Sequence, residues 1–132
     1  MEEQSAEPRV LLADDEILVR DLVQEALEEA GFAVVLARTG GEAMDSLRAA
    51  AQTFRALVTD INFGGQPTGW QVATLARELN ASIGVVYMTG DSAHEWTAQA
   101  VPLSTVVTKP FAPSQIVVAL AAVLNRTDNG EA

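Results

Sequence analysis

Short apolar runs alternate with amphipathic segments five times along this chain. The apolar runs are residues 10–13, 32–37, 55–59, 83–88 and 105–108. They are rich in β-branched residues and mostly continuous, which is typical of strands that are covered on both faces of a sheet. In the segments between them, the apolar positions recur at helical spacing. The pattern therefore predicts five strands and five helices in strict alternation.

The helical segments differ in how clearly they are marked. In the first, the apolar stripe includes Val23, Leu27 and Ala30. Arg20 falls on the opposite polar face, and Gly31 supplies the stop. The fourth, residues 92–100, is short and has a weak apolar pattern. We therefore expect well-formed helices throughout, except for a reduced fourth one.

A repeated strand–helix pattern with short connections predicts a parallel sheet with helices on both faces, because crossovers between parallel strands are right-handed. Five strands in such a doubly wound α/β sandwich usually take the flavodoxin-like (βα)5 order 2-1-3-4-5. Ligands then bind at the carboxyl ends of strands 1 and 3. We expect one domain over residues 8–126, with an acidic N-terminal tail over residues 1–7 and a C-terminal tail over residues 127–132.

Composition and charge exclude several classes of function. The 132-residue chain has a formal net charge of −10, which argues against nucleic-acid binding. It has no apolar run long enough to span a membrane, and its acidic start does not resemble a signal peptide. It also has no cysteine, which removes disulfides and thiolate chemistry. We therefore expect a cytoplasmic protein with neither nucleic-acid nor membrane partners.

Polar side chains follow four of the five predicted strands. Asp14 and Asp15 follow the first, Asp60 the third, Thr89 the fourth and Lys109, the only lysine, the fifth. Each alone is explained as a cap, a turn or a surface cation, but parallel strands bring all of them to one edge of the sheet. Neighbouring carboxylates repel one another unless a cation lies between them, and an all-oxygen site favours Mg²⁺. The convergence predicts a metal site with a lysine that meets the acids or a phosphate.

Four segments at these strand ends resemble the CheY-like receiver domains of two-component response regulators. They read VLLADDE, LVTDIN, YMTGD and VVTKPF, and the resemblance covers residues 9–126. It implies that Asp60 takes a phosphoryl group from a phosphohistidine of a histidine kinase or histidine phosphotransfer protein. It also implies that Asp15, Asp60 and the backbone carbonyl of Asn62 bind Mg²⁺ directly, while Asp14 acts largely through water.

The resemblance carries further expectations for the same site. Lys109 would contact the phosphoryl group, Thr89 would move towards it as the switch, and the Lys109–Pro110 peptide would be cis. Asn62 and Asp91 would tune hydrolysis of the phosphate. Such a chain promotes its own phosphorylation and dephosphorylation, so we expect a signalling protein rather than an enzyme.

Two departures from the family pattern are visible. Gly64 stands where receivers usually have proline, and Gly69 comes one residue late, which predicts a one-residue insertion in a permissive loop. Val106 stands where receivers usually carry the tyrosine or phenylalanine that rotates inward upon activation. Valine has one stiff torsion and no hydroxyl, so that switch cannot operate. Trp96 either replaces it as a readout or is a packing residue.

The last helix predicts a protein-contact surface. Residues 110–125 contain no charge. Three apolar residues lie off the core stripe: Val117, Val118 and Ala121. An uncharged outer face favours a downstream protein target or a homodimer, formed through the 92–100 helix, the 105–108 strand and the last helix. The alternative is an alanine- and valine-rich surface that exposes only scattered methyl groups.

Several functions remain to be weighed. The leading hypothesis is a phosphorelay receiver, either a stand-alone response regulator or the receiver of a hybrid histidine kinase. A pseudo-receiver that binds partners without phosphorylation stays open because of Val106. An aspartyl-phosphate phosphohydrolase is disfavoured because Asn62 occupies the place of its second aspartate. A flavin binder is disfavoured because no Ser/Thr/Gly-rich phosphate loop follows the first strand.

Overall fold

The computed structural model describes residues 7–90 and 96–128. Asp91, which the resemblance links to phosphate hydrolysis, lies outside the described residues, as do residues 92–95 of the predicted fourth helix. The strands are β1 (Arg9–Ala13), β2 (Ala33–Ala37), β3 (Phe54–Asp60), β4 (Gly84–Thr89) and β5 (Ser104–Thr108). The helices are α1 (Ile17–Glu29), α2 (Gly40–Ala50), the short 3-10 turn η1 (Ala51–Thr53), α3 (Gly69–Leu79), α4 (Trp96–Gln99) and α5 (Pro113–Asp128).

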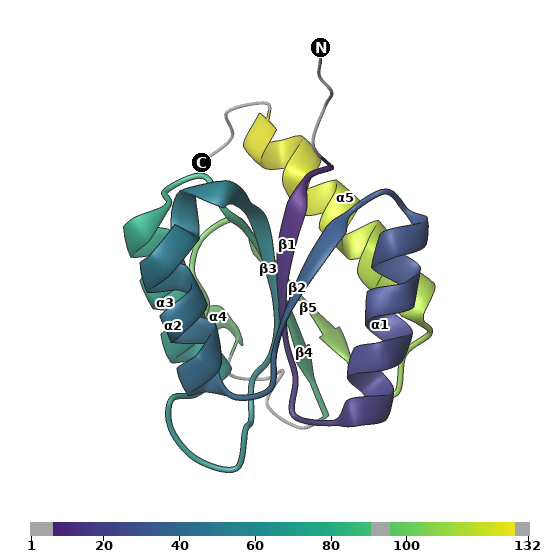
Figure 1. Cartoon of the computed structure of the whole chain (residues 1–132). Helices are drawn as coiled ribbons and strands as arrows, with labels where there is room; N and C mark the ends of the chain where they lie inside the picture. Colours follow the sequence, from purple (N-terminus) through teal and green to yellow (C-terminus); the bar gives the residue numbers. More distant parts are fainter. Residues whose placement is uncertain (1–6, 91–95, 129–132) are drawn as a thin grey trace.

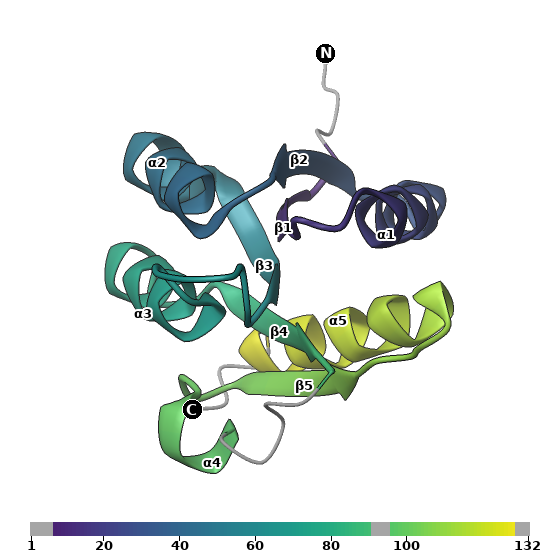
Figure 2. The same ribbon diagram turned by 90° about the horizontal axis from the view of Figure 1, so that it is seen from below.

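The strands form one parallel sheet in the order β2-β1-β3-β4-β5, as the sequence predicts. Figure 1 shows α1 and α5 on one face of this sheet and α2 and α3 on the other. The short α4 lies beside β5 on the side of α3 (Figure 2). Because all strands run in the same direction, their carboxyl ends meet at the lower edge in Figure 1.

The three central strands, β1, β3 and β4, bury both of their faces, whereas the edge strands β2 and β5 are mostly half-buried. Burial on both faces explains the continuous apolar runs of the central strands. One core lies between the sheet and the α2–α3 layer, and it includes Leu11, Leu57, Val85 and Tyr87. The other lies between the sheet and the α1–α5 layer, and it includes Val10, Leu12, Val58 and Val86. These side chains alternate along each strand, so the sheet is fixed in register by apolar contacts on both sides.

The first helix differs from its predicted orientation. Arg20, expected on the polar face, is only 7% exposed, whereas Ala30, expected on the apolar stripe, is exposed. The reason is local: α1 begins three residues after Asp14, so its first turns lie against the end of β1. There, Arg20 Nη1 donates a hydrogen bond to the backbone carbonyl of Asp14 at 3.1 Å.

The last helix extends to Asp128, past the expected domain boundary at residue 126. An ion pair between Arg55 and Asp128, at 2.7 Å, joins its final turn to β3. The uncharged outer face is solvent-accessible as predicted: Val118 is 68% exposed, and Ala121 is also exposed. Across the described ranges, no helix combines the length and apolar character that crossing a bilayer requires.

Candidate functional site

The carboxyl edge of the sheet gathers three carboxylates. Asp14 and Asp15 follow β1, and Asp60 is the last residue of β3. One oxygen from each lies within 4.8 Å of the others. Asp14 and Asp60 are buried, at 0% and 5% exposure, whereas Asp15 faces solvent. The convergence predicted from the strand ends is therefore present in the fold.

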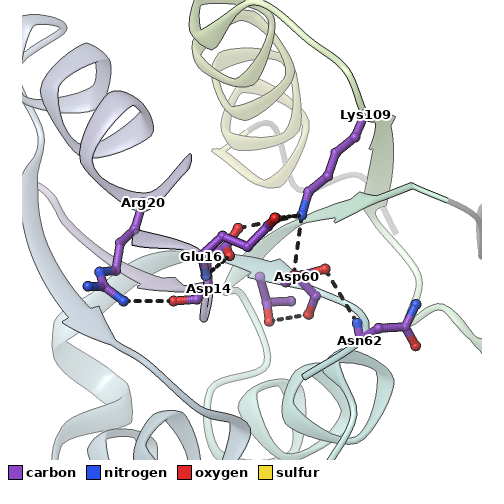
Figure 3. A network of polar contacts seen from close by, with 7 residues as sticks. Asp14, Glu16, Arg20, Asp60, Asn62 and Lys109 are labelled. Atoms are coloured by element: carbon purple, nitrogen blue, oxygen red, sulfur yellow. Dashed lines mark hydrogen bonds and ion pairs between the residues drawn. The ribbon is translucent and has the colours of Figure 1, made fainter. Parts of the chain in front are cut away.

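Lys109 reaches into this acidic cluster from the end of β5 (Figure 3). Its Nζ lies 2.8 Å from Glu16 Oε1 and 3.3 Å from Asp60 Oδ2. A third carboxylate oxygen, Asp14 Oδ2, is 3.8 Å away. Burial alone lowers the pKa of Lys109, but the hydrogen bond to Glu16 and the charges of Asp60 and Asp14 outweigh it, so the pKa is raised. The side chain is therefore a charged ammonium at neutral pH.

Asp14 is the most constrained of the acids. Its Oδ1 accepts a hydrogen bond from the Glu16 backbone amide at 2.8 Å. Its Oδ2 is buried and has no hydrogen-bond donor among the described residues. The pKa of Asp14 is raised to about 6, mainly by burial and further by the charges of Asp60 and Glu16. The hydrogen bond from the Glu16 amide and the charge of Lys109 lower this pKa but do not outweigh the rise. One lysine thus leaves part of the negative charge uncompensated.

Asp60 is held by donors on both carboxylate oxygens. Oδ2 receives Lys109 Nζ, and Oδ1 receives the backbone amide of Asn62 at 3.4 Å. Burial raises the pKa of Asp60, although the charge and hydrogen bond of Lys109 and the amides of Asn62 and Ile61 oppose it. The Asn62 side chain points away from the cluster (Figure 3). A partly uncompensated all-oxygen cluster of Asp14, Asp15 and Asp60 fits a hard divalent cation such as Mg²⁺.

The loop after Asp60 is fixed at its far end by the start of α3. Gly69, the first residue of α3, donates its amide to the Ile61 carbonyl at 2.8 Å. Thr68 and Gln71 form a reciprocal capping box there. Gly64, at the expected permissive position, has φ +81°, a conformation that suits glycine. The start of α3 is therefore tied to the backbone directly after Asp60.

Other residues predicted from the sequence lie on β4, β5 and α4 and in the segment after β5. Thr89 is buried at the end of β4, and its carbonyl accepts the Lys109 amide at 2.7 Å, so the backbones of the two residues adjoin at the carboxyl edge of the sheet. The role of Thr89 as the switch stays a prediction. The Lys109–Pro110 peptide, for which the resemblance implies a cis bond, is cis. Val106 is half-buried in β5. Trp96 opens α4 and packs against the core on the α2–α3 side of the sheet.

Two residues at the site have no role predicted from the sequence. Glu16 forms the shortest contact with Lys109, and Arg20 binds the Asp14 carbonyl (Figure 3). Glu16 directly follows two aspartates, so its proximity could have been inferred from the chain alone. Arg20 gave no such signal, because its spacing matches the polar face of a helix.

The raised pKa of Asp14 predicts an unusual pH dependence for the metal-free protein. The folded state retains the Asp14 proton up to pH of about 6, whereas the unfolded chain loses it near 3.8. The folded state therefore binds more protons in this window, and its free energy of unfolding falls as pH rises from about 4 to 6. Asp14→Asn should remove this loss and stabilise the metal-free protein at pH 7.5 by about 2–3 kcal/mol.

Urea unfolding in EDTA at pH 4.5 and 7.5 measures this effect. The matched control is Asp45→Asn, an exposed carboxylate on α2. If the free energy of unfolding depends on pH equally in wild type and Asp14→Asn, the pKa of Asp14 is not raised in the folded state.

Comparisons with known proteins agree with this geometry. The family model described as "Response regulator receiver domain" matches residues 10–121. A response regulator receiver protein from Sinorhizobium medicae is 37% identical, with a TM-score of 0.87 over 92% of this chain and 97% of that chain. The chemotaxis protein CheY4 from Vibrio cholerae is 26% identical, with a TM-score of 0.76 over 89% of this chain and 99% of that chain.

Curated relatives include longer proteins. The transcriptional regulatory protein YvrH from Bacillus subtilis is 30% identical over 120 residues, which cover 89% of this chain and 49% of that protein. The chain spans about half the length of this relative and of the aerobic respiration control protein ArcA from Escherichia coli. The family match, the flavodoxin-like strand order and the acidic cluster at the strand ends all agree, and this chain belongs to the response regulator receiver domain family of two-component systems.

Proposed function

We propose that this receiver accepts a phosphoryl group on Asp60 from the phosphohistidine of a histidine kinase or histidine phosphotransfer protein. The observation that carries the proposal is the position of the Lys109 ammonium, 3.3 Å from Asp60 Oδ2 and beside an acidic cluster that suits Mg²⁺. The chain is then a signalling protein modified on its own side chain, rather than an enzyme that turns over a separate substrate.

The transfer is a nucleophilic displacement at phosphorus. An oxygen of the Asp60 carboxylate forms the new O–P bond as the N–P bond to the donor imidazole breaks. With a proton on its other ring nitrogen, the imidazole leaves as a neutral histidine side chain. Asp15, Asp60 and the backbone carbonyl of Asn62 would hold Mg²⁺ directly, with Asp14 acting largely through water. The ion would supply positive charge that offsets repulsion between the carboxylate and the phosphoryl oxygens.

Residues of the chain supply the remaining charge and hydrogen bonds. Lys109 already contacts the nucleophile and needs little movement to hold a phosphoryl oxygen. Thr89 lies at the neighbouring strand end, joined to Lys109 through the backbone, and its hydroxyl is the group expected to move towards the phosphoryl group.

The contribution of Lys109 can be measured separately from binding of the metal. Lys109→Gln keeps the polarity and much of the length of the side chain but removes its charge. We expect the rate of phosphoryl uptake to fall about 10²- to 10³-fold, the usual loss when one hydrogen-bond donor to the charge of the transition state is removed. Stopped-flow or quenched-flow kinetics with acetyl phosphate give this rate. A rate within threefold of wild type would exclude a role for Lys109 in transfer.

We further propose how the chain meets its partners. Exposed apolar residues on α1 lie beside the site: Ile17, Leu18 and Leu22. They offer a surface to the phosphodonor protein. The exposed, uncharged face of α5, together with α4 and β5, would contact a downstream target or a second copy of the chain. With such a phosphodonor, we also propose that the protein acts in the cytoplasm.

The direct test is uptake of one phosphoryl group from acetyl phosphate, followed by intact mass spectrometry. We expect a single gain in mass with Mg²⁺ and none with EDTA in excess. No gain at any Mg²⁺ concentration would contradict the proposal and leave a pseudo-receiver. Repeated turnover of a stable phosphate ester would instead indicate a phosphohydrolase.

A further inference from the structure

The strand next to β5 carries a buried tyrosine at the level of Val106. Tyr87 of β4 pairs with Val106 in the parallel ladder, so the two side chains lie side by side on one face of the sheet. Tyr87 is fully buried, and its ring centroid lies 4.7 Å from that of Trp70. Thr89 follows two residues later on the same face of β4. On this face of the sheet, the aromatic side chain therefore belongs to β4, whereas receivers usually carry an aromatic residue at the neighbouring position of β5.

Tyr87 also holds the segment that joins α4 to β5. We call residues 100–104 the α4–β5 strap. The backbone amide of Val101 donates a hydrogen bond to Tyr87 Oη at 3.2 Å. Within the strap, the Ser104 hydroxyl donates to the Val101 carbonyl at 2.6 Å. The tyrosine hydroxyl is thus a direct link between β4 and the strap.

A second link comes from α3. The Arg77 guanidinium donates hydrogen bonds to the carbonyls of Pro102 and Leu103. A planar guanidinium presents two N–H donors to these carbonyls in a fixed geometry, which the single nitrogen of a lysine ammonium matches poorly. Leu103 has φ +56°, a left-handed conformation that is unfavourable for leucine. The strap is therefore kept in a strained conformation by hydrogen bonds from neighbouring elements.

We infer that Tyr87 and Arg77 form a latch that holds the α4–β5 strap, and that displacement of the end of β4 releases it. The release step rests on the proposed function, in which Thr89 moves towards a phosphoryl group on Asp60. Tyr87 is two residues from Thr89 on the same strand and the same face of the sheet. A shift of the β4 backbone at Thr89, drawn along as its hydroxyl moves, would therefore also move the tyrosine hydroxyl. The hydrogen bond between the tyrosine hydroxyl and the Val101 amide, at 3.2 Å, is at the upper end of the usual range, and such a shift would break it. The strap, rather than a rotating aromatic on β5, then reports phosphorylation.

The latch itself is tested without phosphate, by amide hydrogen exchange of the full chain measured by NMR. Tyr87→Phe removes the acceptor hydroxyl and keeps the buried ring, so the Val101 amide should exchange at least tenfold faster. Arg77→Lys should accelerate exchange of other strap amides, because it keeps the charge but loses the fixed two-donor geometry that matches the carbonyls of Pro102 and Leu103. Unchanged Val101 exchange in Tyr87→Phe would overturn the latch.

The matched control for this arm is Thr74→Val. It removes a hydroxyl on α3 that donates to the Trp70 carbonyl, within the helix itself rather than to the strap. We expect strap exchange in this variant to equal that of wild type. Acceleration equal to that in Tyr87→Phe would mean that any loss of a hydroxyl near Trp70 loosens the strap, which also overturns the assignment.

The release step is tested with Mg²⁺ and acetyl phosphate, while intact mass reports phosphoryl uptake. Wild type should exchange its Val101 amide at least threefold faster when phosphorylated, and Tyr87→Phe should take up phosphate normally with no further acceleration. A wild-type protein that gains phosphate without any change in strap exchange would contradict release. Absence of a mass gain would instead defeat the proposed function and the release step together, and the phosphate-free arm still decides whether the latch exists.

Discussion

Replacing Asp60 with asparagine should abolish phosphoryl uptake. The amide carries no negative charge and is a far weaker nucleophile than the carboxylate. The substitution also removes one of the three carboxylates that could hold Mg²⁺. The neighbouring Asp14 cannot substitute, because its Oδ1 is engaged by the Glu16 amide and the group is fully buried. Intact mass spectrometry after incubation with acetyl phosphate and Mg²⁺ should show no gain in the variant.

The loss should not arise from unfolding. Burial raises the pKa of Asp60, which means that its charge is unfavourable in the folded state, so Asp60→Asn should fold at least as stably as wild type in EDTA. Asp45→Asn, which removes an exposed carboxylate on α2, should take up phosphate at the wild-type rate. Phosphorylation of a folded Asp60→Asn variant would place the acceptor at another residue.

The second large effect concerns Gly69, the first residue of α3. A Cβ at this position would clash with the Asp60 carbonyl oxygen and lie 2.7 Å from Ile61 Cα and 2.9 Å from the Asp60 carbonyl carbon. These are backbone atoms of the site and cannot rotate away. We expect Gly69→Ala to lower the free energy of unfolding by about 3 kcal/mol, at the upper end of overpacking costs. Urea denaturation measures this change.

The same substitution should also impair the chemistry, because relief of the clash displaces either α3 or Asp60. Phosphoryl uptake by the folded fraction should fall at least tenfold. Gly65→Ala is the matched control: it lies in the same loop, and a Cβ there meets no atom within 4 Å. A Gly69→Ala protein with wild-type stability and uptake would mean that close packing against Asp60 is not required.

Much of the fold was predictable because the sequence pattern and the physical constraints agree. Strands covered on both faces have continuous apolar runs, and Leu11 and Leu12 of β1 are buried in opposite cores. Right-handed crossovers leave few arrangements for five such strands, and the order 2-1-3-4-5 follows. Since parallel strands end at one edge, the proximity of Asp14, Asp60 and Lys109 could be predicted without knowledge of side-chain positions.

The remaining features depend on tertiary contacts that periodicity does not encode. Arg20 occupies a polar helical position, yet the start of α1 beside β1 buries it against the Asp14 carbonyl. Tyr87 looked like an ordinary buried strand residue, and only the pairing with Val106 and the bond to Val101 give it a distinct role. The end of α5 was underestimated because its polar residues resemble a tail, whereas Asp128 pairs with Arg55.

The most direct test of phosphorylation at Asp60 is to locate the phosphoryl group. Acyl phosphates are reduced by borohydride, which converts a phosphorylated aspartate into homoserine. The protein should be incubated with acetyl phosphate and Mg²⁺, reduced, digested and analysed by peptide mass spectrometry. We expect homoserine at position 60, and only when Mg²⁺ is present. Homoserine at position 14 or 15 instead, or its absence from a protein with an intact Mg²⁺ site, would contradict Asp60 as the phosphoacceptor.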